Sequence, residues 1–128
     1  MEESIKNLID ACRIQAIELL KEFEEYYPFA FGINENGEVV SVSIWLENDF
    51  PDTLELINSL EKALIISSKK NNFIATAICV DVFIDHNLKK QNALEIRINN
   101  TVHNSNTLYY IPYEINHDSI KLMPEYVV

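Results

Sequence analysis

The spacing of apolar side chains predicts an amphipathic helix over residues 4–25. Apolar residues recur there at steps of three and four, which places them on one side of a helix with 3.6 residues per turn. These residues are Ile5, Leu8, Ile9, Cys12, Ala16, Leu19, Leu20 and Phe23. Pro28 follows, and a proline disfavours helical backbone in the residue before it, so we expect the helix to end ahead of it.

A second helix is predicted over residues 52–70. Its apolar stripe consists of Leu54, Ile57, Leu60 and Leu64. Asp52 and Glu55, three residues apart, are typical of a capping box, in which a side chain at the helix start accepts a backbone hydrogen bond. Asn71 and Asn72 follow the stripe, and asparagine is one of the residues that end helices in a left-handed conformation.

Alternation of apolar and polar residues predicts strands in the rest of the chain. Residues 29–33 and 40–46 alternate on either side of Asn36-Gly37, the strongest short-range signal for a hairpin. Further strands are predicted over residues 73–84, 94–98 and 107–115, with a short last strand over residues 120–123. The first of these three is apolar on both faces, which indicates a central strand or one whose second face meets a partner.

The order of these elements predicts an α+β fold made of a single antiparallel sheet. The order is helix, two strands, helix and three strands, and strands joined by short turns run antiparallel. We expect a two-layer sandwich of five or six strands with both helices on one face, forming a single domain over residues 1–128. Five residues are expected to share its one core: Leu8, Phe23, Leu60, Ile78 and Ile96.

Negative charge is concentrated in the first half of the chain. The net charge is −10, and residues 1–61 carry fourteen acids and three bases, while residues 62–128 have a net charge of +1. This argues against nucleic acid or an anionic membrane as a partner, because phosphates need neutralisation by Lys and Arg. A basic protein partner is compatible with the charge.

We therefore expect a non-catalytic acidic protein-binding module, with an immunity-type inhibitor of a basic toxin as one form of it. The partner-binding residues we expect are an acidic helical ridge, Glu18, Glu22 and Glu25, together with two aromatic anchors, Tyr26 and Trp45. Two alternatives remain open: a homodimeric scaffold that pairs through its sheet, and a small-ligand-binding protein.

The sequence contains no pattern typical of an enzyme. Asp81, Asp85 and His86 come nearest to a metal-binding set, but four residues of strand span about 13 Å, too far for one ion. Cys12 and Cys79 lie in apolar surroundings, where a thiol is unreactive, so we expect both to be buried and reduced. We expect no catalytic residue, no metal and no cofactor.

The start of the chain lacks the basic and apolar regions of a signal peptide, and no stretch approaches 20 apolar residues. A cytoplasmic location is expected.

Two segments resemble small bacterial proteins in which a helix is followed by an (F/Y)YPF-type segment. These are Glu25-Tyr26-Tyr27-Pro28-Phe29, ahead of the Asn-Gly hairpin, and the later Pro112-Tyr113 pair. The resemblance implies no activity, so no functional residue follows from it. The element order also looks like the roadblock or profilin-like layout, of which this chain lacks the final helix; this is an analogy of layout alone.

Overall fold

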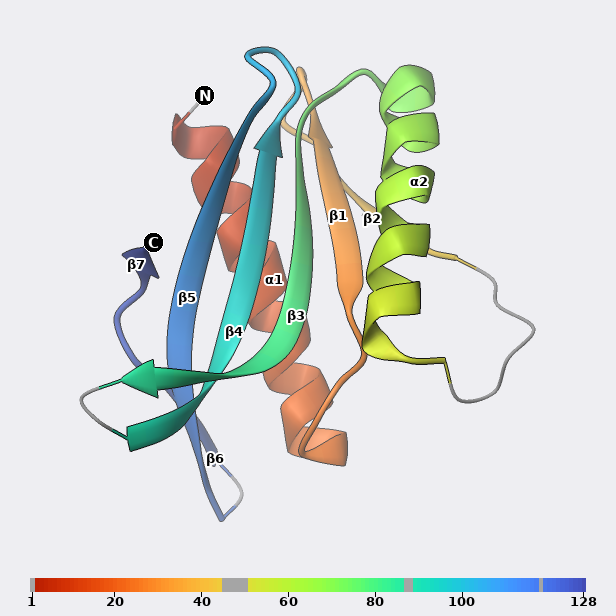
Figure 1. Cartoon of the computed structure of the whole chain (residues 1–128). Helices are drawn as coiled ribbons and strands as arrows, with labels where there is room; N and C mark the ends of the chain where they lie inside the picture. The colour runs from red at the N-terminus through yellow and green to blue at the C-terminus, as the bar shows by residue number, and fades with distance from the viewer. Residues whose placement is uncertain (1, 45–50, 87–88, 118) are drawn as a thin grey trace.

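The computed structural model describes residues 2–44, 51–86, 89–117 and 119–128, and it confirms an α+β fold with one antiparallel sheet. In this part of the chain the elements are α1 (Glu2–Phe23), β1 (Phe29–Asn34), β2 (Val39–Val42), α2 (Thr53–Asn71), β3 (Phe73–His86), β4 (Lys89–Asn100), β5 (Ser105–Asn116), β6 (Ser119–Leu122) and β7 (Tyr126–Val127). The strands lie in the order β2-β1-β3-β4-β5-β6, and β7 pairs with β5 (Figure 1). The sheet thus has seven strands rather than five or six.

The two helices lie on opposite faces of the sheet, so the expectation that both cover one face is wrong. Cys79 of β3 packs in the same cluster as Leu8 of α1, whereas its neighbour Ile78 packs with Leu60 of α2. Successive residues of a strand point to opposite faces, so the sheet separates the two helices. The molecule has three layers, with α1 behind the sheet and α2 in front of it in Figure 1.

The position of β3 explains this arrangement. It lies between β1 and β4, and residues 75–80 are all buried. A strand that is apolar on both faces has to be covered on both. β2 and β3 each run antiparallel to β1, which lies between them, so they are parallel to each other and α2 makes the crossover that joins them.

The predicted single core is therefore two cores. The cluster under α1 contains Leu8 and Ile96, and the cluster under α2 contains Leu60 and Ile78. Phe23 belongs to neither cluster and is 60% exposed, which corrects its assignment to the core. Cys12 and Cys79 are confirmed as buried, free thiols in the α1 cluster.

Local signals in the sequence determine where α2 begins and ends and where the chain turns between β1 and β2. The Asp52 carboxylate accepts a hydrogen bond of 2.8 Å from the Glu55 backbone N–H, as the capping pattern predicts. Asn72 ends the helix in the left-handed region with φ of 55°. Gly37, with φ of 82°, provides the turn between β1 and β2, a conformation that glycine adopts without steric penalty.

The double coverage of β3 predicts a large effect of truncating Ile78, which is 5% exposed under α2. Ile78→Ala should lower the free energy of unfolding by about 2–5 kcal/mol, because it leaves a cavity between helix and sheet. Ile66→Ala is the control: Ile66 is 69% exposed on the same helix, and its truncation should change stability by about 0.5 kcal/mol or less. Denaturant unfolding of both variants measures this. A loss below about 1 kcal/mol for Ile78→Ala would contradict the packing described.

Candidate functional site

The C-terminal end of α1 is shaped by the way the helix stops. Its last helical residue is Phe23, and Glu24 follows with φ of 64° while its N–H donates to the Leu20 carbonyl at 2.9 Å. Glycine is the usual residue at this left-handed position, because a side chain there is strained by about 1 kcal/mol or more. The residue that follows the helix is therefore a strained, exposed acid. This end of α1 lies in the lower part of Figure 1.

The predicted acidic ridge is present at this end. Glu18 and Glu22 are one turn apart on α1, Glu25 follows the helix end, and all three side chains are exposed. Glu22 lies in the last turn, and Glu24 and Glu25 come directly after it, where the helix dipole is unfavourable to negative charge. The dipole of α1 therefore does not stabilise the negative charges of these acids.

Two aromatic rings are exposed among these acids, and they are not the ones that the sequence predicted. Phe23 is 60% exposed and Tyr27 is 56% exposed. The apolar stripe ends at Leu20, which is fully buried, so Phe23 continues the spacing of the stripe but finds no sheet to cover it. The flanking acids Glu22 and Glu24 are the sequence signal that could have identified Phe23 as a surface residue.

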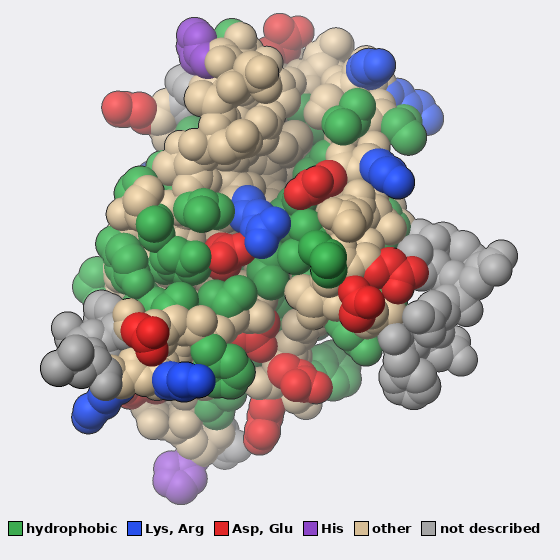
Figure 2. Space-filling view, viewed as in Figure 1, with side chains coloured by type: hydrophobic (Ala, Val, Ile, Leu, Met, Phe, Trp, Pro, Cys, Tyr) green, Lys and Arg blue, Asp and Glu red, His purple; other side chains and the backbone are tan. Residues whose placement is uncertain are grey.

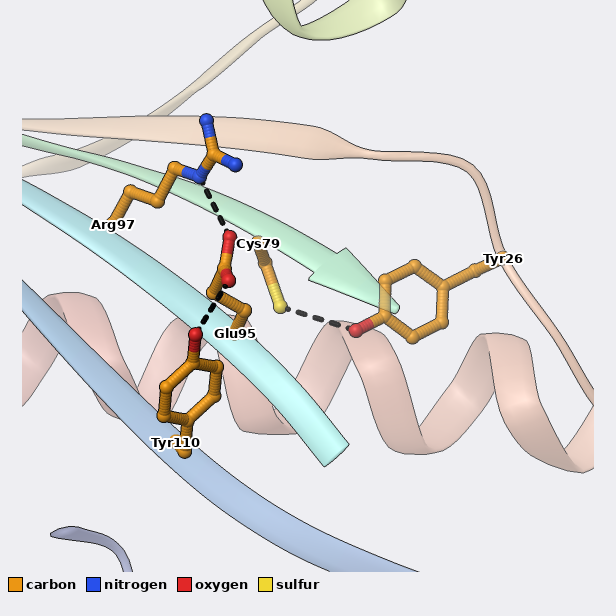
Figure 3. Close-up of polar contacts among 5 residues, drawn as sticks. All are labelled: Tyr26, Cys79, Glu95, Arg97 and Tyr110. Carbon is orange, nitrogen blue, oxygen red and sulfur yellow. Dashed lines mark hydrogen bonds and ion pairs between the residues drawn. The ribbon is translucent and has the colours of Figure 1, made fainter. Parts of the chain in front are cut away.

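Tyr26 is turned inward instead. Its hydroxyl is 3.4 Å from Cys79 Sγ (Figure 3). The side chain packs against the α1 cluster, and its ring centre lies 5.4 Å from that of Phe29. Burial, followed by the nearby Cys79, raises the pKa of the Tyr26 hydroxyl far above its usual value, so it stays neutral. Its ring holds the chain against the sheet rather than offering an anchor to a partner.

A carboxylate on β3 extends the negative surface. Asp81 accepts a hydrogen bond of 2.7 Å from the Tyr113 hydroxyl of β5. Burial raises the pKa of Asp81, and the negative charge of Glu25 raises it further, although the Tyr113 hydrogen bond acts in the opposite direction. Glu25 is thus close enough for its negative charge to act on Asp81.

We call Glu18, Glu22, Phe23, Glu24, Glu25 and Tyr27 the acidic–aromatic end of α1. Trp45, the other predicted anchor, lies outside the described residues. In the part of the chain that the structure describes, no three His, Cys, Asp or Glu side chains come together in a way that could hold a metal ion. Among the same residues, no helix is long and apolar enough to cross a membrane.

Asp81 and Asp85, considered in the sequence as part of a metal-binding set, lie in different environments. Asp81 is half-buried and bonded to Tyr113, whereas Asp85 is exposed four residues further along β3. The side chain of His86 is outside the described part. The acidic–aromatic end presents four exposed acids and two exposed aromatic rings.

Comparison with protein-family models, with curated proteins and with solved structures gave no match. The resemblance to the (F/Y)YPF-type proteins and the roadblock or profilin-like analogy stay predictions. The function proposed for this protein therefore rests on the geometry and the charges of the molecule itself.

The strain at Glu24 predicts that this residue is not optimal for stability. Glu24→Gly should raise the free energy of unfolding by about 1 kcal/mol, because glycine adopts φ of 64° without steric penalty. Asn72→Gly at the end of α2 is the control: asparagine tolerates the left-handed region, so the change there should be smaller. Thermal or denaturant unfolding of both variants measures the difference. A loss of stability in Glu24→Gly would show that the Glu24 side chain makes a stabilising contact.

Proposed function

We propose that this protein is a non-catalytic acidic module that binds a basic protein through the acidic–aromatic end of α1. An immunity-type inhibitor that covers a basic toxin is the form of this function that we favour. The observation that carries the proposal is the exposure of two aromatic rings, Phe23 and Tyr27, among the exposed acids of one helix end.

The two kinds of side chain supply different parts of binding. Exposed aromatic rings are enriched among the residues that dominate interface energy, because they bury a large rigid surface. Exposed charges mainly speed the encounter with an oppositely charged partner. Phe23 and Tyr27 would provide the anchor, and Glu18, Glu22, Glu24 and Glu25 would attract and orient the partner.

The placement of the acids supports a binding role over a stabilising one. Glu24 occupies a strained backbone position, and Glu25 repels Asp81. Each of these features lowers the stability of the folded chain. A surface that only needed to be soluble could carry its acids at positions without these penalties.

The net charge of the chain favours binding of a basic protein over association of two copies of the chain. Each chain carries a net charge of −10, so association of two copies brings like charges together. A basic protein gains from the same field. The homodimeric scaffold is therefore the less favoured of the binding functions.

The test uses charge reversal at this surface. The partner would first be captured from the native host by a photo-crosslinking residue placed at Tyr27, with one at exposed Ile66 as the control position. Association of that partner would then be measured with wild type and with Glu22→Lys/Glu25→Lys. We expect association to slow by about tenfold or more at low salt, with a smaller difference at moderate salt.

A matched variant separates local from overall charge. Glu35→Lys/Glu38→Lys makes the same change in net charge at two exposed residues of the β1–β2 hairpin, and it should slow association far less. Phe23→Ala should weaken binding mainly through faster dissociation, as expected for an anchor. Equal slowing by both charge-reversed pairs, or no effect of Phe23→Ala, would contradict the proposed site.

A further inference from the structure

The two faces of the sheet bury polar groups of different kinds. On the face that carries α2, Figure 2 shows an acidic and a basic side chain next to each other between the sheet and α2. Glu95 is 8% exposed on this face, and its carboxylate accepts from Arg97 Nε at 2.7 Å and from the Tyr110 hydroxyl at 2.9 Å (Figure 3). Among the described residues no buried side-chain nitrogen or oxygen lacks a hydrogen-bond partner. The other face buries two free thiols, those of Cys12 and Cys79.

The two thiols meet at the contact between α1 and β3. Cys12 of α1 and Cys79 of β3 are both fully buried in the α1 cluster. The hydrogen bond that Cys12 shares with Cys79 is the largest cause of the raised pKa of the Cys12 thiol, and burial adds to it. The two sulfur atoms are therefore neighbours, although they come from opposite halves of the chain.

Small side chains surround this pair. Ala16 lies one turn from Cys12 on α1, and it is fully buried. On β3, Ala75 and Ala77 share the α1 face with Cys79 and are fully buried in the same cluster. A disulfide needs Cα atoms within about 7 Å of each other. Alanine side chains let a helix approach a sheet closely, so the packing around the pair is compatible with a bond between the two sulfur atoms.

We propose that Cys12 and Cys79 are a disulfide-forming pair, which a small-molecule disulfide such as oxidised glutathione converts into a covalent bond between α1 and β3. One protein thiolate attacks the small disulfide, forms a mixed disulfide with it and releases one small thiol. The second protein thiolate then displaces the remaining half as another small thiol. The protein sulfurs lose two electrons, the small disulfide gains them, and the two protons of the protein thiols end on the two released thiols.

The fold shields both states of this pair from exchange. Neither sulfur is exposed, and the Tyr26 hydroxyl lies 3.4 Å from Cys79 Sγ. The thiolate is the reactive form of cysteine, and the raised pKa of Cys12 keeps that thiol protonated. Exchange therefore takes place while the chain folds or when α1 lifts from the sheet. A bond that forms then is shielded from reductants in the same way.

The bond would hold α1 on the sheet. It closes residues 12–79 into a loop, and closing a loop stabilises a fold mainly by restricting the unfolded chain. Oxidation would thus raise the free energy that is needed to lift α1. This inference goes beyond the proposed function and does not depend on it, because both sulfur atoms lie in the interior rather than at the acidic–aromatic end.

The test measures the equilibrium between thiols and disulfide in mixtures of reduced and oxidised glutathione. The full chain is brought to equilibrium from both the reduced and the oxidised side, once folded and once in guanidinium chloride, and mass spectrometry of the linked peptides identifies the internal bond. The equilibrium constant for bond formation should be at least about tenfold larger in the folded chain than in the denatured chain. A ratio of one or less would overturn the proposal, because the fold would then oppose the bond.

A displaced thiol is the matched control. Cys79→Ala/Ala77→Cys moves one sulfur by two residues along the same buried face of β3, which is about 7 Å. In denaturant this variant should form the bond with Cys12 as readily as wild type, and in the folded state it should lose the tenfold advantage. Bond formation equal to that of wild type in the folded variant would contradict the specific pairing of Cys12 with Cys79.

Thermal unfolding gives a second measurement on the wild-type chain. The oxidised form should melt at least about 4 °C above the form kept reduced, which is the tenfold ratio converted for a domain of this size. Cys79→Ala forms no internal bond, so its melting temperature should be the same under both conditions. Equal melting temperatures of the two wild-type forms, or oxidation that mainly links separate chains, would also overturn the proposal.

Discussion

The two-sided apolar character of β3 is the constraint on which the rest of the structure depends. Residues 75–80 are buried on both faces of the sheet, so no arrangement with all the helices on one side could cover them. α1 covers one face and α2 the other. The sheet therefore separates two clusters that meet only through the backbone and small side chains of its central strands.

Two exposed parts of the molecule result from the limits of this coverage. α1 is 22 residues long, and its last residue, Phe23, lies beyond the buried cluster that ends at Leu20, so its ring is exposed among acids. α2 packs on β1 to β3 and leaves β4 and β5 to form the floor of a groove. Each helix covers one face of β3 and leaves a different part of the molecule exposed.

The sequence predicted the elements well because their signals are local. Periodicity located both helices, Asp52 and Asn72 marked the ends of α2, and Asn36-Gly37 marked the hairpin. Which face of the sheet each helix covers depends on contacts between segments that are far apart in the sequence. The pattern of β3 shows that both of its faces are apolar, but it does not show which helix covers which face. The exposure of Phe23 and the burial of Glu95 were missed for the same reason. The first depends on where the sheet stops, and the second on Arg97 and on Tyr110 of the neighbouring strand.

A double-mutant cycle across the sheet tests the separation of the two cores most directly. Leu8→Ala empties part of the α1 cluster, and Leu60→Ala empties part of the α2 cluster. We predict that their effects on the free energy of unfolding add to within about 0.5 kcal/mol, because the residues share no partners. Leu8→Ala with Ile96→Ala, within one cluster, is the comparison cycle and should show a larger coupling. A coupling above about 1 kcal/mol between Leu8 and Leu60 would mean that the two helices share one core, which would contradict the three-layer structure.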